Sequence, residues 1–208
     1  MNYTRLLMVM ALAGFLVACA RQPAPPERLP DAQQAASRAL PTLQQMVTEQ
    51  NYREMGFESV DEVKSAVLGG PIQVYVVDLN RLKEYQAGGD PQGLLTPSND
   101  VVYPVLVKSG VRSSIRVTNQ GNGWGTSGFG GANLIKAVAK QMAGESDFEV
   151  QVPVFNLYFV GQRRENKLFL VPIVDDPRFN LKAGSALPAE EVFRLLSGAA
   201  KEHNGLPT

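Results

Sequence analysis

The chain contains only one cysteine, Cys19, and one histidine, His203, among its 208 residues. Zinc centres in proteins are built from sets of cysteine and histidine side chains, so this composition excludes the usual zinc sites. His203 lies near the end of the last predicted helix, where a basic side chain is favourable without any catalytic role. No spacing singles out a nucleophile with a positioned base. The sequence therefore predicts no catalytic residue, no metal and no cofactor.

An excess of charge of either sign is also missing, because twenty basic residues balance twenty acidic ones. Nonspecific binding to nucleic acids depends on neutralising phosphates with a positive surface. We therefore expect no nucleic-acid partner. With 44% hydrophobic and 19% charged residues, the composition is that of a globular protein with a sizeable core.

A long hydrophobic run is absent too. The apolar stretch LLMVMALAGFLV, residues 6–17, is too short to span a bilayer, which takes roughly 20 apolar residues. It follows Arg5 and has the length of the apolar region of a signal peptide. Small residues then lead to Cys19. The segment after the cysteine, residues 20–30, holds four prolines and predicts an extended tether.

The segment LVAC, residues 16–19, resembles the lipobox of bacterial lipoproteins. This resemblance covers the signal segment alone. It implies cleavage before Cys19, a diacylglycerol on its sulfur and acylation of the new amino terminus, which together anchor a protein stably in a membrane. Ala20, in place of an aspartate, resembles lipoproteins sent to the outer membrane and facing the periplasm. The alternatives are a secretory signal cleaved elsewhere and an uncleaved anchor helix.

Three parts of the chain are expected from these features. Residues 1–18 form a signal peptide, residues 19–30 form the lipidated cysteine and its tether, and residues 31–208 form a single domain. Helices are predicted over residues 31–50, with a break at Pro41, after the capping box SVDE at 59–62, over residues 134–142 and from residue 188 to near residues 201–205. Strands are predicted within residues 71–79 and over residues 101–107, 111–118, 148–160 and 167–174.

Two hairpins within this set of strands favour a mainly antiparallel sheet of about five strands covered by helices, which is an α+β fold. The order of elements resembles that of cystatin-like and profilin-like ligand-sensing domains. Residues 148–160 are apolar on both sides, which predicts a central position in the sheet. Their aromatic side chains either fill the core or line a groove.

A glycine-rich segment, GNGWGTSGFGGAN, separates the third predicted strand from the following helix. Gly123, Gly125 and Gly128 formally match the dinucleotide-binding pattern GxGxxG. The preceding strand belongs to a hairpin, however, and the segment TNQ, residues 118–120, stands before the first glycine, which should close the strand directly, so the expected context is absent. We interpret these glycines as permitting turns around a packed Trp124.

The start of the next predicted helix, GGAN, leaves backbone N–H groups free, and such a terminus can hold an anion. Two arginines project from the preceding strand toward the same region. The candidate site for a ligand or an anion consists of Arg112, Arg116, Gly128, Gly130, Gly131 and Asn133. The alternative is that both arginines are solvated charges on an open sheet face.

We expect a membrane-anchored, non-catalytic protein that binds a protein partner in the cell envelope. A small-ligand sensor and a hydrolase of envelope polymers are the alternatives. A pocket lined by the arginines and the glycine-rich loop would favour the sensor, whereas a broad apolar patch would favour the partner. Two carboxylates that face each other in a cleft would favour the hydrolase.

Overall fold

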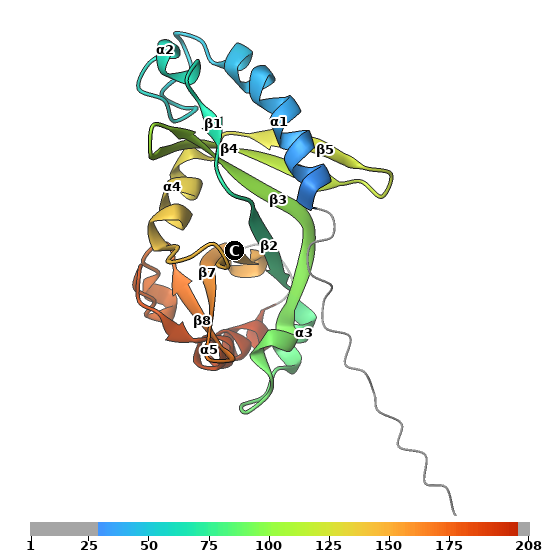
Figure 1. Ribbon diagram of the computed structural model, residues 1–208. Coiled ribbons are helices and arrows are strands. Elements are labelled where there is room, and N and C mark those ends of the chain that lie inside the picture. The colour runs from blue at the N-terminus through green and yellow to red at the C-terminus, as the bar shows by residue number, and fades with distance from the viewer. Residues whose placement is uncertain (1–28, 204–208) are drawn as a thin grey trace, which may run out of the picture.

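The computed structural model describes residues 29–203. The predicted signal peptide, the lipidation of Cys19 and nearly all of the tether lie outside these residues. A continuous nine-stranded sheet runs through the described chain, in the order β5-β4-β3-β2-β6-β7-β8-β9 with β1 paired to β3 (Figure 1). The pair β2–β6 is parallel and the other pairs are antiparallel.

The helices are interspersed among the strands along the chain. The strands are β1 (Val67–Leu68), β2 (Ile72–Val77), β3 (Leu95–Val107), β4 (Gly110–Asn119), β5 (Trp124–Phe129), β6 (Phe148–Val152), β7 (Leu157–Arg164), β8 (Lys167–Pro172) and β9 (Leu187–Pro188). The α-helices are α1 (Leu29–Met46), α2 (Val60–Val63), α3 (Leu79–Glu84), α4 (Ala132–Gln141) and α5 (Ala189–Glu202).

Helices cover both faces of the sheet (Figure 1). On one face, α1 packs over β3 and β4, and α3 and α5 pack over β6, β7 and β8. On the opposite face, α4 packs over the middle of the sheet. Alternation along β3 explains this division, because Leu95 and Val101 point to the first face and Val102 points to the second. The two faces carry separate cores.

The predicted α+β fold with a mostly antiparallel sheet is confirmed, but the predicted number of about five strands is wrong. The turns predicted around a packed Trp124 are confirmed in part: Gly121 and Gly123 have positive φ in the turn before Trp124, and Trp124 packs against the core under α1. Residues 124–129 then form the strand β5, which was not predicted. The segment predicted as one strand over residues 148–160 is two strands, because a 3-10 turn at Pro153–Phe155 and a left-handed Asn156 reverse the chain. β1 and β9 have two residues each, which is too short for a periodic pattern.

Pro41 does not divide the first helix as predicted, since α1 is continuous from Leu29 to Met46. A proline within a helix leaves the carbonyl four residues earlier without its usual N–H partner. Here that carbonyl belongs to Ser37, and both Ser37 and Pro41 are exposed, so water can hydrate it. The buried side of α1 consists of Ala32, Ala35, Ala36, Ala39 and Leu43.

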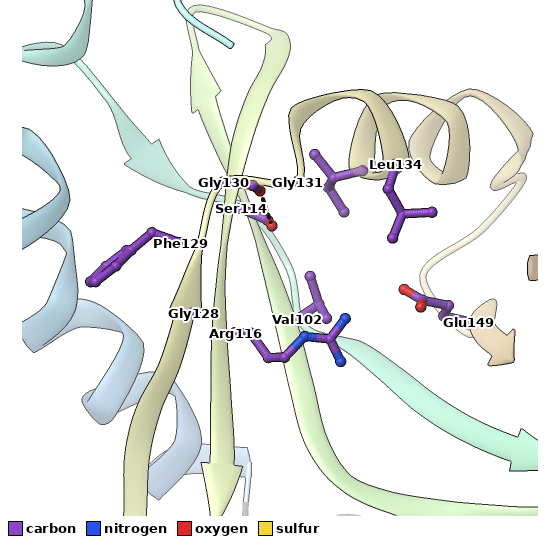
Figure 2. A pocket seen from close by; sticks show the side chains of 10 residues that line it. Val102, Ser114, Arg116, Gly128, Phe129, Gly130, Gly131, Leu134 and Glu149 are labelled. Atoms are coloured by element: carbon purple, nitrogen blue, oxygen red, sulfur yellow. Dashed lines mark hydrogen bonds between the residues drawn. The ribbon is translucent and has the colours of Figure 1, made fainter. Parts of the chain in front are cut away.

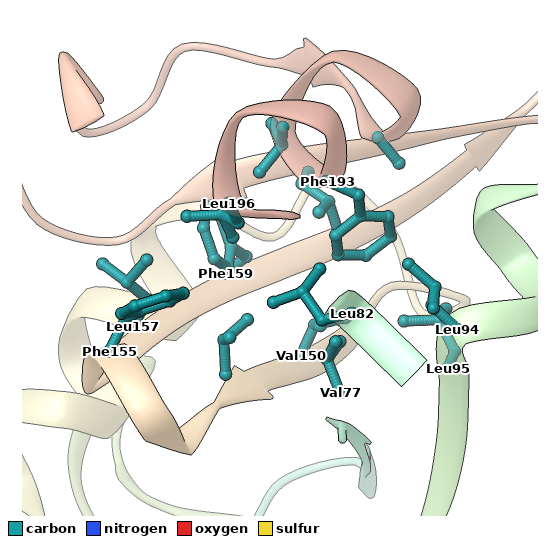
Figure 3. Packing of buried hydrophobic residues seen from close by; sticks show 14 of the residues in the cluster. Val77, Leu82, Leu94, Leu95, Val150, Phe155, Leu157, Phe159, Phe193 and Leu196 are labelled. Carbon is teal, nitrogen blue, oxygen red and sulfur yellow. The ribbon is translucent and has the colours of Figure 1, made fainter. Parts of the chain in front are cut away.

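The larger core lies between α5 and the strands β6, β7 and β8 (Figure 3). Phe159 of β7 and Phe193 of α5 are fully buried there, with Phe155 beside them. Of the two interpretations of the aromatic residues in this hairpin, core packing is therefore confirmed for Phe155 and Phe159. The central position predicted for this segment is also confirmed, because β6 and β7 lie inside the sheet.

Tyr103 of β3 is fully buried beneath α1, and its hydroxyl has no hydrogen-bond partner among the described residues. Burial raises the pKa of this hydroxyl to about 12. An unsatisfied buried polar group costs stability, so Tyr103→Phe is expected to raise the free energy of unfolding by about 1 kcal/mol. Urea denaturation at neutral pH measures this gain.

Tyr85 provides the matched control, because its buried hydroxyl donates to the carbonyl of Gly89 at 3.0 Å. Tyr85→Phe is expected to lower the free energy of unfolding by about 1 kcal/mol. In the wild type, Tyr103 holds its proton longer in the folded than in the unfolded chain, so this residue's contribution to stability falls as pH rises from 10 toward 12. Equal losses from both variants would contradict this account of Tyr103.

Candidate functional site

A cavity of about 110 Å³ lies between α4 and the sheet face that α4 covers (Figure 2). Residues from β3, β4, β5, β6 and the start of α4 line it. Its polar and glycine residues are Ser114, Arg116, Gly128, Gly130, Gly131 and Glu149, and its apolar walls are Val102, Phe129, Leu134 and Ile135. The volume is room for about three or four water molecules at about 30 Å³ each, so the cavity fits a small molecule.

Arg116 reaches the cavity because of the alternation along β4. Ile115 and Val117 point into the core under α1, so Arg116 projects from the opposite face. Its Nη1 donates to Oδ2 of Asp100 at 3.0 Å. Thr118 donates to the other oxygen of Asp100. Figure 2 shows the guanidinium of Arg116 extending toward Glu149. Arg116 is thus held by one carboxylate while it points at another.

Glu149 is the deepest ionisable group of the cavity, with 1% of its surface exposed. It lies on β6 opposite Val74 of β2, on the face that α4 covers. Gln151 donates a hydrogen bond to its Oε1. Burial raises the pKa of the Glu149 carboxyl, the hydrogen bond from Gln151 and the charge of Arg116 oppose this rise, and Asp100 adds to it. The carboxylate is therefore costly to keep ionised without a further positive partner.

The amino terminus of α4 forms another side of the cavity. Gly131 is its N-cap, with a left-handed φ of 62°, and supplies no side-chain hydrogen bond to the first turn. The preceding residue, Gly130, has a φ of 98°. Its carbonyl accepts hydrogen bonds from the backbone N–H of Ser114 at 3.1 Å and from the Ser114 hydroxyl at 2.6 Å. These bonds fix the glycine turn to β4, so the uncapped helix start is held in place.

Four of the six residues predicted for the site line this cavity: Arg116, Gly128, Gly130 and Gly131. Arg112 does not. Its Nε lies 2.7 Å from Oε1 of Glu62 and its Nη2 lies 2.7 Å from Oε1 of Glu58. Both acids flank α2, so Arg112 joins that helix to β4. Asn133 is exposed on the first turn of α4 and is not among the lining residues.

Glu149 was missed by the sequence reasoning. Its strand reads FEVQV, in which Glu149 and Gln151 alternate with apolar residues. That pattern is typical of a strand with one solvated face. The signal that could have identified Glu149 is the apolar side of α4, which needs a sheet face to cover and so leaves no solvated face there.

A second hollow, of about 510 Å³, runs along the outer side of β5 beside α1. Arg38 and Thr42 of α1 form one side and Trp124 and Phe129 of β5 form the other. β5 pairs with β4 along one edge and is the last strand of the sheet at this end. Its opposite edge therefore has no strand partner within residues 29–203.

No group of three or more metal-ligating side chains comes together within residues 29–203. No helix of this segment has the length and apolar character of a membrane span. The glycines of the GxGxxG match do not form a loop between strand and helix, because Gly125 and Gly128 lie within β5. The exposed large hydrophobic residues sit on four separate elements: Met46, Val67, Val174 and Leu195.

Comparison with known proteins finds nothing similar: no family model, no curated protein and no solved structure matches the chain. The resemblance in element order to cystatin-like and profilin-like domains consequently gains no support from a solved structure.

Proposed function

We propose that this chain is a lipid-anchored protein of a bacterial envelope whose domain binds a small polar ligand without covalent chemistry. The cavity between α4 and the sheet carries the binding part of this proposal. Arg116, Glu149 and the uncapped start of α4 converge on it from three separate parts of the chain. Small-molecule sites are typically concave and apolar with a few convergent polar groups. The cystatin-like or profilin-like arrangement belongs to the same proposal, since such domains sense ligands.

The anchoring part of the proposal rests on the sequence LVAC and on the apolar run before it. The proposed location is the outer membrane, with the domain facing the periplasm at the end of a proline-rich tether. Cys19 is the only cysteine of the chain, so its lipidation leaves no free thiol in an oxidising compartment. The anchoring part and the binding part of the proposal together describe a domain that binds its ligand while it is held at a membrane surface.

Intact mass and membrane fractionation of the wild type and of Cys19→Ser test the anchor. We expect the wild type to lose residues 1–18, to gain the mass of the acyl chains and to sediment with membranes. Because the sulfur is the site of attachment, Cys19→Ser is expected to keep its signal segment and gain no lipid. A wild type that retains residues 1–18 or carries no lipid would contradict the proposed anchor.

A protein partner is the second candidate function, and the groove between β5 and α1 favours it. An exposed strand edge can accept an extended segment of another protein through backbone hydrogen bonds. Trp124 is the only tryptophan of the chain, so its fluorescence reports occupation of this groove. The small-ligand function is preferred because a buried carboxylate, an arginine and an uncapped helix start meet at the cavity, whereas the exposed large hydrophobic residues of the described chain come from four different segments.

The hydrolase alternative receives less support from the site. A glycosidase requires two carboxyl groups that flank the same bond. Glu149 is the only carboxylate among the residues that line the cavity in the described chain. Asp100, the nearest candidate for a second one, is engaged by Arg116 and Thr118. We therefore propose binding without catalysis.

A further inference from the structure

The charges at the cavity favour a ligand that brings an amine rather than an anion alone. Arg116 carries the one positive side chain that lines the cavity, and its charge is matched by Asp100 at 3.0 Å. Glu149 adds a second carboxylate to this group. With both acids ionised, two negative charges surround one positive charge. A free phosphate or a simple carboxylate would add negative charge to this excess.

The start of α4 supplies the opposite polarity. The partial positive charge of a helix amino terminus and its free N–H groups favour a negative ligand group, and the N-cap Gly131 offers no side chain in competition. Figure 2 shows Glu149 across the cavity from Gly130 and Ser114. The Glu149 carboxylate, which attracts a positive group, and the N–H groups at the start of α4, which donate to a negative group, therefore lie on different sides of the cavity.

We infer that the cavity takes a small zwitterion, an α-amino acid of the size of glycine or alanine. Its ammonium group pairs with the Glu149 carboxylate, and its carboxylate accepts hydrogen bonds from the backbone N–H groups at the start of α4. This inference rests on the proposed ligand-binding function and names the ligand class. The volume of about 110 Å³ matches a ligand of this size.

Glu149 must be ionised to pair with the ammonium group. The groups that face it are Gln151 on its own strand, Arg116 on β4 and Asp100 on β3. Because burial raises the pKa of Glu149, acidification protonates it at a higher pH than an exposed glutamate. The affinity for the amino acid is therefore expected to fall as the pH is lowered below neutrality.

Isothermal titration calorimetry on the full chain, purified in detergent, tests the ligand class. The probes are glycine, alanine, methylamine, acetate and inorganic phosphate. We expect glycine or alanine to bind most tightly, methylamine more weakly, and acetate and phosphate not at all. Removing the buried charge in Glu149→Gln is expected to weaken alanine binding about tenfold or more.

Two further variants separate a lost site from a lost fold. Gly128 lies opposite Arg116 in the β4–β5 pair, so a side chain there points to the cavity face, and an added Cβ meets nothing within 4 Å. Gly128→Leu is expected to fill the cavity and abolish binding. The same substitution at Gly198 of α5, also in open space, is the matched control and is expected to bind alanine like the wild type.

Glu149→Gln is expected to unfold at a higher temperature than the wild type at neutral pH, because it removes a buried charge.

The outcomes test separately whether the ligand is an amino acid and whether the domain binds a small ligand at all. If phosphate or acetate binds and Glu149→Gln strengthens that binding, the zwitterion is wrong while the ligand-binding function stands. If alanine binds equally to the wild type and to Gly128→Leu, the amino acid occupies another place and the inference is overturned. If no probe binds to the wild type, the inference fails. A change in Trp124 fluorescence on addition of a protein partner would then favour the second candidate function, with the partner bound in the groove between β5 and α1.

Discussion

Gly56→Ala is expected to lower the free energy of unfolding by at least about 3 kcal/mol. Gly56 has a φ of +96°, a conformation that alanine adopts only under strain. A Cβ at this position would lie 2.0 Å from the backbone oxygen of Arg112 and 2.6 Å from the Cβ of Ala132. Neither atom belongs to a flexible side-chain end, so β4 or α4 must move. Chemical denaturation of the purified variant measures the loss.

Gly88→Ala is the control that separates the cost of the positive φ from the cost of the steric clash of the added Cβ. Gly88 also has a positive φ, of +82°, but an added Cβ meets nothing within 4 Å. We expect this control to lose about 1 kcal/mol, the lower end of the cost of a strained backbone conformation. If Gly56→Ala loses no more than Gly88→Ala, the close approach of the Gly56 turn to β4 and α4 is wrong.

This position also links stability to the site. The carbonyl of Gly56 accepts a hydrogen bond from Lys136 of α4 at 3.1 Å. The turn thus packs against α4 and β4, two elements that line the cavity. A displacement of α4 would move the start of this helix away from Arg116. The folded Gly56→Ala variant is therefore expected to bind ligand weakly.

Phe193→Ala is the second large effect, with an expected loss of about 3 to 5 kcal/mol in the free energy of unfolding. Phe193 is fully buried between α5 and the strands, and its ring meets Tyr85 edge to face at 6.0 Å (Figure 3). Truncation leaves a cavity in a core that α3 also shares, so the surrounding structure collapses only in part. Thermal and urea denaturation both report this loss.

Leu195 is the control for Phe193 because it lies on the same helix and is 43% exposed. Leu195→Ala is expected to change the free energy of unfolding by less than about 0.5 kcal/mol. A similar loss in both variants would mean that α5 contributes through helix formation alone, which would contradict the packing of α5 on the sheet.

Local patterns in the sequence were sufficient for several elements. The alternation in β4 predicts that Val111, Ile115 and Val117 share one apolar face. This is confirmed for Ile115 and Val117, which lie in the core under α1, but it is wrong for Val111, which packs with the residues under α4 because the β3–β4 register shifts next to it. The capping box at the start of α2 is also confirmed, since Ser59 accepts a hydrogen bond from the N–H of Glu62 at 3.2 Å. α5 begins and ends close to its predicted limits. These features depend on neighbours within a few residues, which a single sequence contains.

Contacts between distant segments could not be obtained in this way. Arg112 and Arg116 both occupy polar positions in the alternation of β4. In the structure, however, Arg112 pairs with Glu58 and Glu62, whereas Arg116 pairs with Asp100 of β3. Glu149 reads as a solvated residue until α4 is placed over its strand. β5 contains two glycines, Gly125 and Gly128, and follows Gly121 and Gly123; such a glycine-rich segment is typical of turns. Its strand conformation comes from pairing with β4, which is a tertiary interaction.

Four of the six polar and glycine residues of the candidate site were predicted from the sequence. Gly128, Gly130 and Gly131 precede a predicted helix, and Arg116 lies on the strand before them. The charge balance of the site was not predicted, because the proposal of an anion counted Arg112 and Arg116 as free charges. Ion pairs at 2.7 Å and 3.0 Å show that both charges are already matched. Charge balance at a site depends on partners that come from other parts of the chain.

A two-dimensional NMR spectrum of backbone N–H groups in the ¹⁵N-labelled full chain, with and without alanine, tests the central claim most directly. The account predicts that the signals of Ser114, Gly130 and the first turn of α4 shift on addition of alanine. It also predicts that these signals do not respond to alanine in Gly128→Leu. Unchanged spectra in both proteins, or shifts confined to residues outside the cavity, would contradict the assignment of this cavity as the ligand site.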